Sequence, residues 1–433
     1  MASYSNLILV REGPGGALAR FWALAGDPVL AGNPSGTRIY GAVPLARVWT
    51  AVLSGYLALG ATLQELPRYV PQRFHAGPFA VGLAVGLAFA GTAAGRPLAG
   101  RAGDGGRART TAMTGSLLTA VGAAGNLLAP DFGMLLVSRL VMGLGEAALF
   151  SGTLPWVLAG IQPSRVGRTA GWFGLSMWCG LSAGPLLAVI AGHIAGSSAV
   201  WSLVIALPLV SAAILASTPR TVIQASRRTR PLAWRSLLPH GPGIAGILIG
   251  TASFGYGTIT ALLVLFLGTR GLGAGGSFGL AAFSAAFLVT RAAGSPLVDR
   301  YGGLPVARVV LLAESAGLAL LAGAHSAAAA LWAVALAGVG LGLVYPAATK
   351  LTLRRASVSA AGAAIGTMTS FWDLGILIAG PVGGLIAAGY GFRAAFWAAA
   401  AMPVAAVALS AGSGIKMRAP DSTGSQDGEL SRS

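Results

Sequence analysis

Charged side chains are scarce in this sequence of 433 residues. Only 9% of the residues are Asp, Glu, Lys or Arg, whereas 55% are hydrophobic and the mean hydropathy is +0.74. A soluble globular domain carries about 25% charged residues. This scarcity argues against a soluble protein and predicts a chain embedded in the lipid bilayer. The 65 glycines fit that prediction, because glycine allows membrane helices to approach closely.

Cysteine and histidine are also nearly missing. Cys179 is the one cysteine, so no disulfide can form within the chain, and the four histidines are dispersed along it. The sequence contains no HExxH motif and no phosphate-binding loop. We therefore expect no metal site, no cofactor and no enzyme activity. A membrane enzyme or a receptor with many spans remains a distant alternative.

Acidic residues are much rarer than basic ones, with 12 Asp and Glu against 29 Lys and Arg. The resulting net charge of +17 could indicate nucleic-acid binding, but the arginines lie in short loops between apolar runs. Membrane topology explains this placement better, since basic residues concentrate in cytoplasmic loops. We expect no nucleic-acid partner.

Twelve apolar runs are long enough to cross a bilayer, which requires about 20 mostly apolar residues. The sequence therefore predicts an all-α membrane protein with 12 transmembrane helices. The runs lie near residues 47–66, 77–96, 110–129, 133–160, 167–193, 199–217, 242–267, 275–295, 304–324, 327–349, 361–388 and 393–412.

Basic residues are distributed unequally between alternate loops. One set of loops contains most of the arginines, and the other contains only Arg68, Arg73, Arg270 and Arg393. The positive-inside rule makes the basic set cytoplasmic. We expect an integral protein of the cytoplasmic membrane with both termini in the cytoplasm.

The chain repeats itself at an offset of 195 residues. Residues Arg96, Asp104, Gly143, Gly145, Gly167, Gly171 and Gly180 recur as Arg291, Asp299, Gly338, Gly340, Gly362, Gly366 and Gly375. Two pseudo-symmetric six-helix bundles explain such a repeat. The predicted organisation is a disordered extension (1–46), a first bundle (47–217), a basic cytoplasmic linker (218–241), a second bundle (242–412) and a disordered cytoplasmic tail (413–433).

One charged loop motif occurs once in each half. The chain reads "GRPLAGRAGDGGRAR" after the second run and "GSPLVDRYGG" after the eighth. Both stretches resemble the cytoplasmic loop signature of the major facilitator superfamily, with candidate residues Asp104, Arg107, Arg109, Asp299 and Arg300. Gly105 stands where the signature has arginine, and Leu304 and Pro305 replace later basic residues. A carboxylate at a helix end can pair with an arginine of the next helix and act as a conformational latch.

Two further motifs strengthen the resemblance. Arg139, Gly143, Gly145 and Ala147 in "RLVMGLGEAALF" match the pattern of the fourth span, whose arginine the family associates with proton transfer. "GWFGLSMWCGLSAGP" resembles the fifth-span signature of the proton-coupled exporters, with Gly171, Gly180, Gly184 and Pro185 at the expected spacing. The signature's trailing glycine pair is replaced by Ala188 and Val189.

The resemblance implies secondary active export of a small organic molecule, a drug or metabolite, in exchange for protons. Proton-coupled import of a sugar or an organic anion is the alternative within the superfamily. The implied partners are a small-molecule substrate, protons and the lipid bilayer, and a monomer is compatible with the sequence.

Three charged residues inside apolar runs are the candidates for proton coupling and substrate binding. Arg139 and Glu146 are seven residues apart and share one face of the fourth run, and Asp373 lies about 18 Å into the eleventh. Such groups are costly in lipid, so we expect them to face a cavity and to form pairs. Arg96 and Arg291 are expected to extend from helix ends toward water. Four aromatic residues are candidates for lining the cavity: Tyr56, Tyr256, Tyr345 and Trp372.

Overall fold

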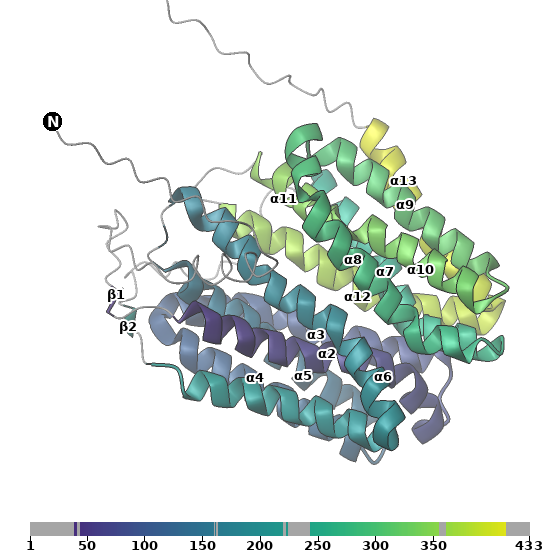
Figure 1. Ribbon diagram of the computed structural model, residues 1–433, viewed down its shortest axis with the longest axis horizontal. Helices are drawn as coiled ribbons and strands as arrows, with labels where there is room; N and C mark the ends of the chain where they lie inside the picture. Colours follow the sequence, from purple (N-terminus) through teal and green to yellow (C-terminus); the bar gives the residue numbers. More distant parts are fainter. Residues whose placement is uncertain are drawn as a thin grey trace, which may run out of the picture.

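Helices make up almost all of the structure that can be described (Figure 1). The computed structural model describes residues 39–40, 44–159, 161, 163–219, 222–223, 243–354 and 361–412. The predicted tail (413–433) and most of the predicted extension and linker lie outside these residues. Two short strands are described there, β1 (Ile39–Tyr40) and β2 (Val222–Ile223), and they pair antiparallel.

Most of the predicted apolar runs begin within two residues of an observed helix start. The first half contains α2 (Leu45–Phe74), α3 (Pro78–Ala102), α4 (Ala108–Leu128), α5 (Phe132–Leu158) and α6 (Pro163–Ala216). The second half contains α7 (Gly243–Thr269), α8 (Gly273–Tyr301), α9 (Gly303–Gly323), α10 (Ala327–Gly342), α11 (Val344–Leu353), α12 (Ala361–Tyr390) and α13 (Phe392–Gly412).

Three helices continue well past the predicted ends of their apolar runs. Helices α2, α3 and α8 extend six to eight residues further, through segments that contain charged side chains. Hydropathy marks the part of a helix that suits lipid, whereas the backbone can stay helical beyond it.

Two of the predicted runs share one helix and another is divided. Helix α6 covers both the fifth and the sixth run, and its backbone leaves helical geometry at Ala195 and Gly196, where Gly196 has a φ of 71°. The tenth run is divided into α10 and α11 at Leu343.

Nine segments of the described chain are long and apolar enough to cross a membrane. Two of them, at 78–128 and 169–216, each contain two predicted runs, and α2 is not among the nine. The all-α membrane fold is thus confirmed, while the count of twelve crossings stays a prediction.

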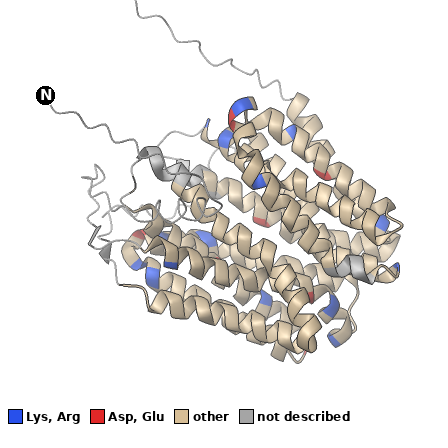
Figure 2. Cartoon of the chain, in the orientation of Figure 1, with Lys and Arg blue, Asp and Glu red and all other residues tan. Residues whose placement is uncertain are grey.

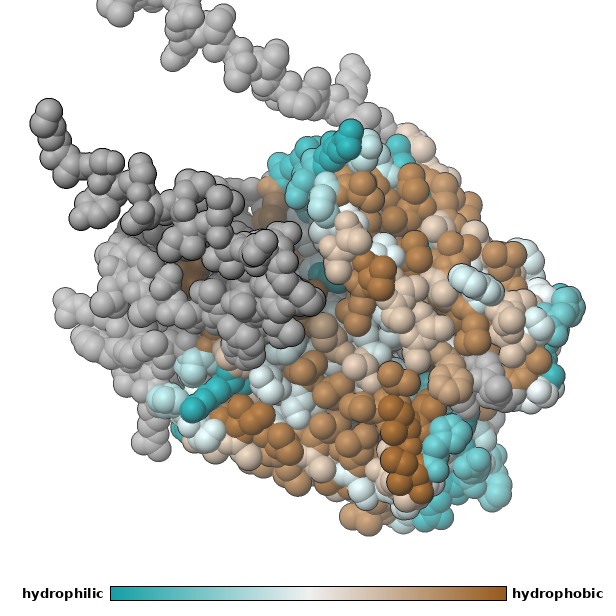
Figure 3. Space-filling view, viewed as in Figure 1, coloured by the Kyte–Doolittle hydropathy of each residue, from teal (hydrophilic) through white to brown (hydrophobic). Residues whose placement is uncertain are grey.

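The outer surface is apolar along the helices. Large hydrophobic side chains are widely exposed there, among them Trp332 (79%), Leu128 (75%) and Val309 (68%). Figure 3 shows this hydrophobic surface, with hydrophilic residues gathered toward the helix ends. Figure 2 shows most charged residues at the same ends and a few isolated ones in the interior. Such a surface suits contact with acyl chains.

Several arginines bind the exposed carbonyl groups at the ends of neighbouring helices. The Arg109 guanidinium donates to the carbonyl oxygens of Leu215 (3.1 Å) and Ala216 (2.6 Å) at the end of α6. Arg308 donates to the hydroxyl oxygen (2.8 Å) and the carbonyl oxygen (2.6 Å) of Ser410 near the end of α13. The last carbonyls of a helix lack partners within it, and cations there are favourable. These arginines therefore stabilise the packing of neighbouring helices.

The repeat seen in the sequence recurs in the packing of the two halves. A Cβ atom on Gly143 would overlap the backbone of Ala88, and one on Gly338 would overlap the backbone of Phe283, which lies 195 residues after Ala88. Gly145 packs on Thr119 in the first half as Gly340 packs on Glu314 in the second. The shared glycines thus set equivalent helix contacts, which confirms the pseudo-symmetry.

The halves meet where α3 runs beside α12 (Figure 1). A Cβ atom on Gly82 would overlap the carbonyl group of Gly380, and one on Gly86 would lie 2.7 Å from the carbonyl oxygen of Leu377. Small residues allow membrane helices to pack backbone against backbone. This contact carries α3 past the middle of α12, and it positions the charged residues described next.

Candidate functional site

Arg96 and Asp373 form an ion pair between the two halves. The Nε atom of Arg96 is 2.6 Å from one carboxylate oxygen of Asp373, and its Nη2 atom is 3.2 Å from the other. The side chain of Asp373 is fully buried and that of Arg96 is 13% exposed. The expectation that Arg96 extends toward water is therefore wrong, because α3 lies so close to α12 that its guanidinium reaches a buried carboxylate.

Glu146 on α5 is a buried carboxyl group without a hydrogen-bond partner. Its side chain is 0% exposed, and neither carboxylate oxygen has a partner. Arg139, Arg96 and Asp373 all lie close enough to interact with it electrostatically. The Tyr56 hydroxyl donates to its backbone carbonyl (3.3 Å), so α2 packs against this turn of α5. The predicted charged residues thus belong to one buried group.

Arg139 is also fully buried, but it does not pair with Glu146 as expected. Its Nε donates to the carbonyl oxygen of Ala84 on α3 (2.9 Å), and its Nη1 lies 3.2 Å from the sulfur of Met142. Gly143 causes this difference, because it brings the backbone of α5 against α3 and places that carbonyl within reach. Both Arg139 and Glu146 are enclosed by protein in this state, rather than facing the open cavity that we expected.

Arg291 on α8 is buried as well, which overturns the expectation of a solvated helix end. It is 9% exposed, and its Nη1 atom has no hydrogen-bond partner. Its guanidinium carbon lies 5.3 Å from the ring centre of Trp178 and 5.5 Å from that of Tyr345. Two aromatic faces therefore stabilise this cation through cation–π contact.

The two rings over this arginine belong to a connected group of six aromatic rings. We call them the aromatic cluster: Trp178, Tyr256, Phe283, Phe287, Tyr345 and Trp372. Trp178 comes from the first half, and its ring centre lies 5.0 Å from that of Phe287 and 5.1 Å from that of Trp372. Tyr256 stacks on Trp372 at 5.8 Å. Three of the four predicted lining residues are thus brought together, and Tyr56 instead lies beside Phe150.

The two buried arginines occupy equivalent positions, and so do their partners. Arg96 and Arg291 are 195 residues apart, as are Trp178 and Asp373. Each arginine contacts the opposite half at an equivalent position. Arg96 contacts the carboxylate of Asp373, whereas Arg291 contacts the indole ring of Trp178. The offset of the repeat, which already relates Arg291 to Arg96, points to Trp178 when it is applied to Asp373.

The loop motif is arranged differently from the predicted latch. In the first copy, Asp104 lies in a π-helical turn (Gly103–Arg107), is exposed and forms no ion pair with any described residue. In the second copy, Asp299 is 3.3 Å from the ammonium group of Lys350 on α11, rather than paired with an arginine. Arg300 instead lies over the ring of Tyr301.

The fifth-span motif serves helix packing. A Cβ atom on Gly180 would lie 2.9 Å from backbone atoms of α2, and one on Gly184 would lie 2.5 Å from them, so both positions need a small residue. Pro185 is buried in α6, whereas a Cβ atom on Gly171 would meet nothing within 4 Å. Gly180 and Gly184 of the motif therefore hold α6 against α2, whereas Gly171 at the start of the motif does not.

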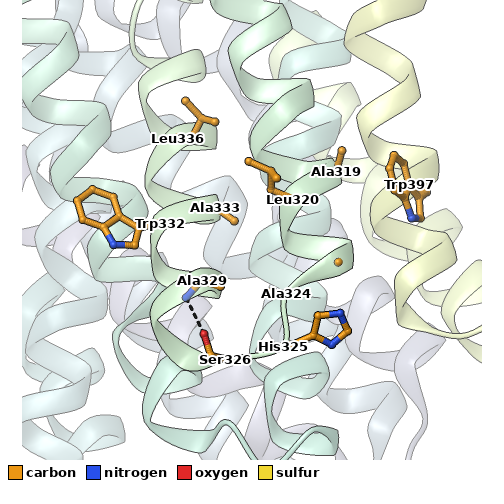
Figure 4. A pocket seen from close by; sticks show the side chains of 11 residues that line it. Ala319, Leu320, Ala324, His325, Ser326, Ala329, Trp332, Ala333, Leu336 and Trp397 are labelled. Atoms are coloured by element: carbon orange, nitrogen blue, oxygen red, sulfur yellow. Dashed lines mark hydrogen bonds between the residues drawn. The ribbon is translucent and has the colours of Figure 1, made fainter.

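A pocket of about 750 Å³ opens elsewhere, between α9, α10 and α13. Figure 4 shows its lining, with His325 and Ser326 at one end and Trp332 and Trp397 on either side. It includes none of the buried charged residues and none of the aromatic cluster. Within the described ranges, no group of His, Cys, Asp and Glu could hold a metal ion. The buried charges and the aromatic cluster are therefore the candidate site.

Comparison with known proteins agrees with this architecture. The sequence profile of the Major Facilitator Superfamily matches residues 48–380 and 277–426. An uncharacterized MFS-type transporter of Salmonella typhimurium is 30% identical over 386 residues, covering 87% of this chain and 98% of the relative. The uncharacterized MFS-type transporter YhhS of Escherichia coli is 31% identical, covering 82% of this chain and 89% of YhhS.

Solved structures show the same fold at low sequence identity. The nucleoside transporter NupG superposes with a TM-score of 0.68 at 11% identity, covering 85% of this chain and 99% of NupG. The xylose transporter XylE of E. coli gives a TM-score of 0.68 at 14% identity, covering 87% and 98%. With the family profile spanning most of the chain and relatives of similar length, this protein belongs to the Major Facilitator Superfamily of membrane transporters.

Proposed function

We propose that the protein exports a small organic molecule across the cytoplasmic membrane in exchange for protons. The two halves would rock about a central site and expose it to each side in turn. Proton and cargo would occupy this site alternately. The membrane potential can drive such export, since moving one charge across 100 mV supplies about 2.3 kcal/mol.

The carboxyl group of Glu146 is the observation that carries this proposal. An ionised carboxylate without a hydrogen-bond partner is expensive away from water. Glu146 is fully buried with both oxygens unpartnered, so its neutral, protonated form is the cheaper one in this state. When the halves separate and water reaches the group, the charged form becomes favourable. Glu146 can thus bind a proton on one side and release it on the other.

The ion pair between Arg96 and Asp373 supplies the link to conformation. It joins α3 of the first half to α12 of the second. Separation of these helices must break it, which leaves two charges in need of water, a proton or cargo. Protonation of Asp373 or a competing cargo group would release Arg96 and favour opening. The lone carboxyl of Glu146 lies within electrostatic range of both partners.

The direction of transport rests on the fifth-span motif, whose glycines pack α6 against α2. Import remains the alternative, and fold neighbours include transporters of a nucleoside and of xylose. The placement of both termini in the cytoplasm rests on the distribution of arginine among the loops.

Transport in inside-out membrane vesicles tests this function. An acidic vesicle interior should drive a panel of labelled drugs and metabolites into vesicles that contain the protein, and collapse of the pH gradient by a protonophore should stop it. Vesicles with the Glu146→Gln protein should show no gradient-driven uptake. Glu65→Gln is the control, because that carboxylate accepts a hydrogen bond from Ser197 outside the candidate site. Uptake that does not depend on the pH gradient, or that persists in vesicles with the Glu146→Gln protein, would contradict the proposal.

A further inference from the structure

We infer that Arg291 and the aromatic cluster form a binding site for an organic anion with an apolar or aromatic body. This inference rests on the proposed function, because it names the class of molecule that the transporter carries. Two observations support it: the unpartnered guanidinium nitrogen of Arg291 and the chemistry of the surrounding side chains.

The first observation is a cation without a counter-charge. Arg291 is buried, and its Nη1 atom has neither a hydrogen-bond partner nor contact with solvent. No acidic side chain of the described residues forms an ion pair with it. The equivalent arginine of the first half, Arg96, has such a partner in Asp373. A buried guanidinium nitrogen without an acceptor is costly, and an anionic ligand would remove that cost.

The second observation is the surface offered around this cation. The ring centres of Trp178 and Tyr345 lie 5.3 and 5.5 Å from the guanidinium carbon, and the Nη1 atom of Arg291 has no acceptor. Trp178 also contacts Phe287 and Trp372, so apolar ring surface continues from the arginine toward Asp373. Sites for small organic ligands combine such apolar walls with a few polar groups that fix orientation. An anion head at Arg291 and an apolar body along the rings would satisfy both parts.

The position of the cluster links binding to conformational change. Trp178 belongs to the first half, whereas Arg291, Tyr345 and Trp372 belong to the second. A ligand held between Arg291 and Trp178 would contact both halves. The affinity of the site for this ligand would therefore change when the halves move relative to each other. Asp373, beside Trp372, would repel the anion unless it stays paired with Arg96. The ion pair therefore makes the site selective for negative cargo while it is intact.

Cys179 provides a probe for this site without any engineering. It is the chain's one cysteine, it is half-buried, and it directly follows Trp178 in α6. The rate of its alkylation by N-ethylmaleimide in the purified full-length protein should fall when the site is occupied. The probes are three acids, each compared with its neutral amide: benzoate, 4-hydroxybenzoate and indole-3-acetate.

At a concentration equal to its dissociation constant, a protecting acid should roughly halve the alkylation rate, and its amide should have no effect. Arg291→Gln should abolish protection, and Arg291→Lys should weaken it, since a lysine keeps the charge but not the planar contact. Arg354→Gln, which removes an exposed arginine at the end of α11, should behave as wild type. The unfolding temperature of each variant, measured without ligand, verifies that it is folded.

The anion site is wrong if none of the three acids protects Cys179, if the amides protect equally, or if a folded Arg291→Gln protein is still protected. These results are separate from the vesicle assay. Gradient-driven transport of neutral compounds together with absent protection would remove the anion site and leave proton exchange intact. Protection of Cys179 without gradient-driven transport would support the anion site and contradict proton exchange.

Discussion

Arg96 and Asp373 form a two-point ion pair across the boundary between the halves, with nitrogen to oxygen distances of 2.6 and 3.2 Å. A planar guanidinium and a carboxylate fit each other in this way with strict geometry. The pair lies beyond the glycine contact of α3 and α12, so it can form only when these helices are together. It therefore reports the relative position of the two halves.

Loss of one partner of this pair should destabilise the protein more than loss of both. Asp373→Asn or Arg96→Gln alone leaves a buried group uncompensated, which costs about 3–5 kcal/mol for a buried ion pair. The double variant removes both charges and should recover much of that loss. Thermal unfolding of the purified variants in detergent measures this coupling. Additive losses in the double variant would show that the two side chains do not interact.

Replacement of Glu146 by a neutral residue should abolish proton coupling without lowering the stability of the protein. Glu146→Gln preserves size and removes the titratable proton. Because the native carboxyl group lacks hydrogen-bond partners, we expect the unfolding temperature to stay at or above that of wild type. Flux down a substrate gradient should persist while flux against it fails. A paired measurement of exchange and of accumulation in proteoliposomes distinguishes the two. A variant that unfolds, or that accumulates substrate normally, would contradict this role.

Addition of a methyl group at Gly82 should disturb the contact between the halves. A Cβ atom there would overlap the backbone of Gly380, and overpacking of this kind costs about 1–3 kcal/mol. Gly82→Ala should therefore lower the population of the state described here. The control is Gly171→Ala, whose new methyl group meets nothing within 4 Å. Cysteine cross-linking between α3 and α12, in a background that lacks Cys179, should slow for Gly82→Ala and stay unchanged for Gly171→Ala.

Much of the fold could be predicted because its signals are local. Apolar runs of the required length located the helices and most of their starts, and the offset of 195 residues indicated the equivalence of Gly143 with Gly338. Hydropathy and glycine spacing reflect the membrane and close packing, and both patterns can be recognised in the sequence of a single helix. Family membership followed from motifs that such packing maintains.

The site was harder to predict because its contacts cross between helices. Arg96 lies at the end of a predicted span in the sequence, where a solvated arginine is the ordinary outcome. Only the depth to which α3 runs beside α12 brings it to Asp373. Arg139 was expected to pair with a carboxylate on its own helix face, yet a neighbouring carbonyl lies closer. Side-chain partners in a bundle depend on helix contacts that hydropathy does not describe.

Export of an anion against an entering proton should be electrogenic. One anion leaving and one proton entering both move with an inside-negative potential, and each charge contributes about 2.3 kcal/mol per 100 mV. An imposed potassium diffusion potential with valinomycin should therefore accelerate benzoate efflux from proteoliposomes when the interior is negative. Efflux that does not respond to the potential would contradict a one-to-one exchange of anion and proton.

The proposed role of Glu146 as the proton carrier can be tested directly. Addition of a transported substrate to purified protein in weakly buffered detergent solution, with a pH indicator present, reports protons released on binding. If proton and cargo occupy the site alternately, wild type should acidify the solution by about one proton for each bound substrate, and Glu146→Gln should bind without acidification. Equal proton release from wild type and Glu146→Gln, or none from either while both bind substrate, would contradict the assignment of Glu146 as the coupling group.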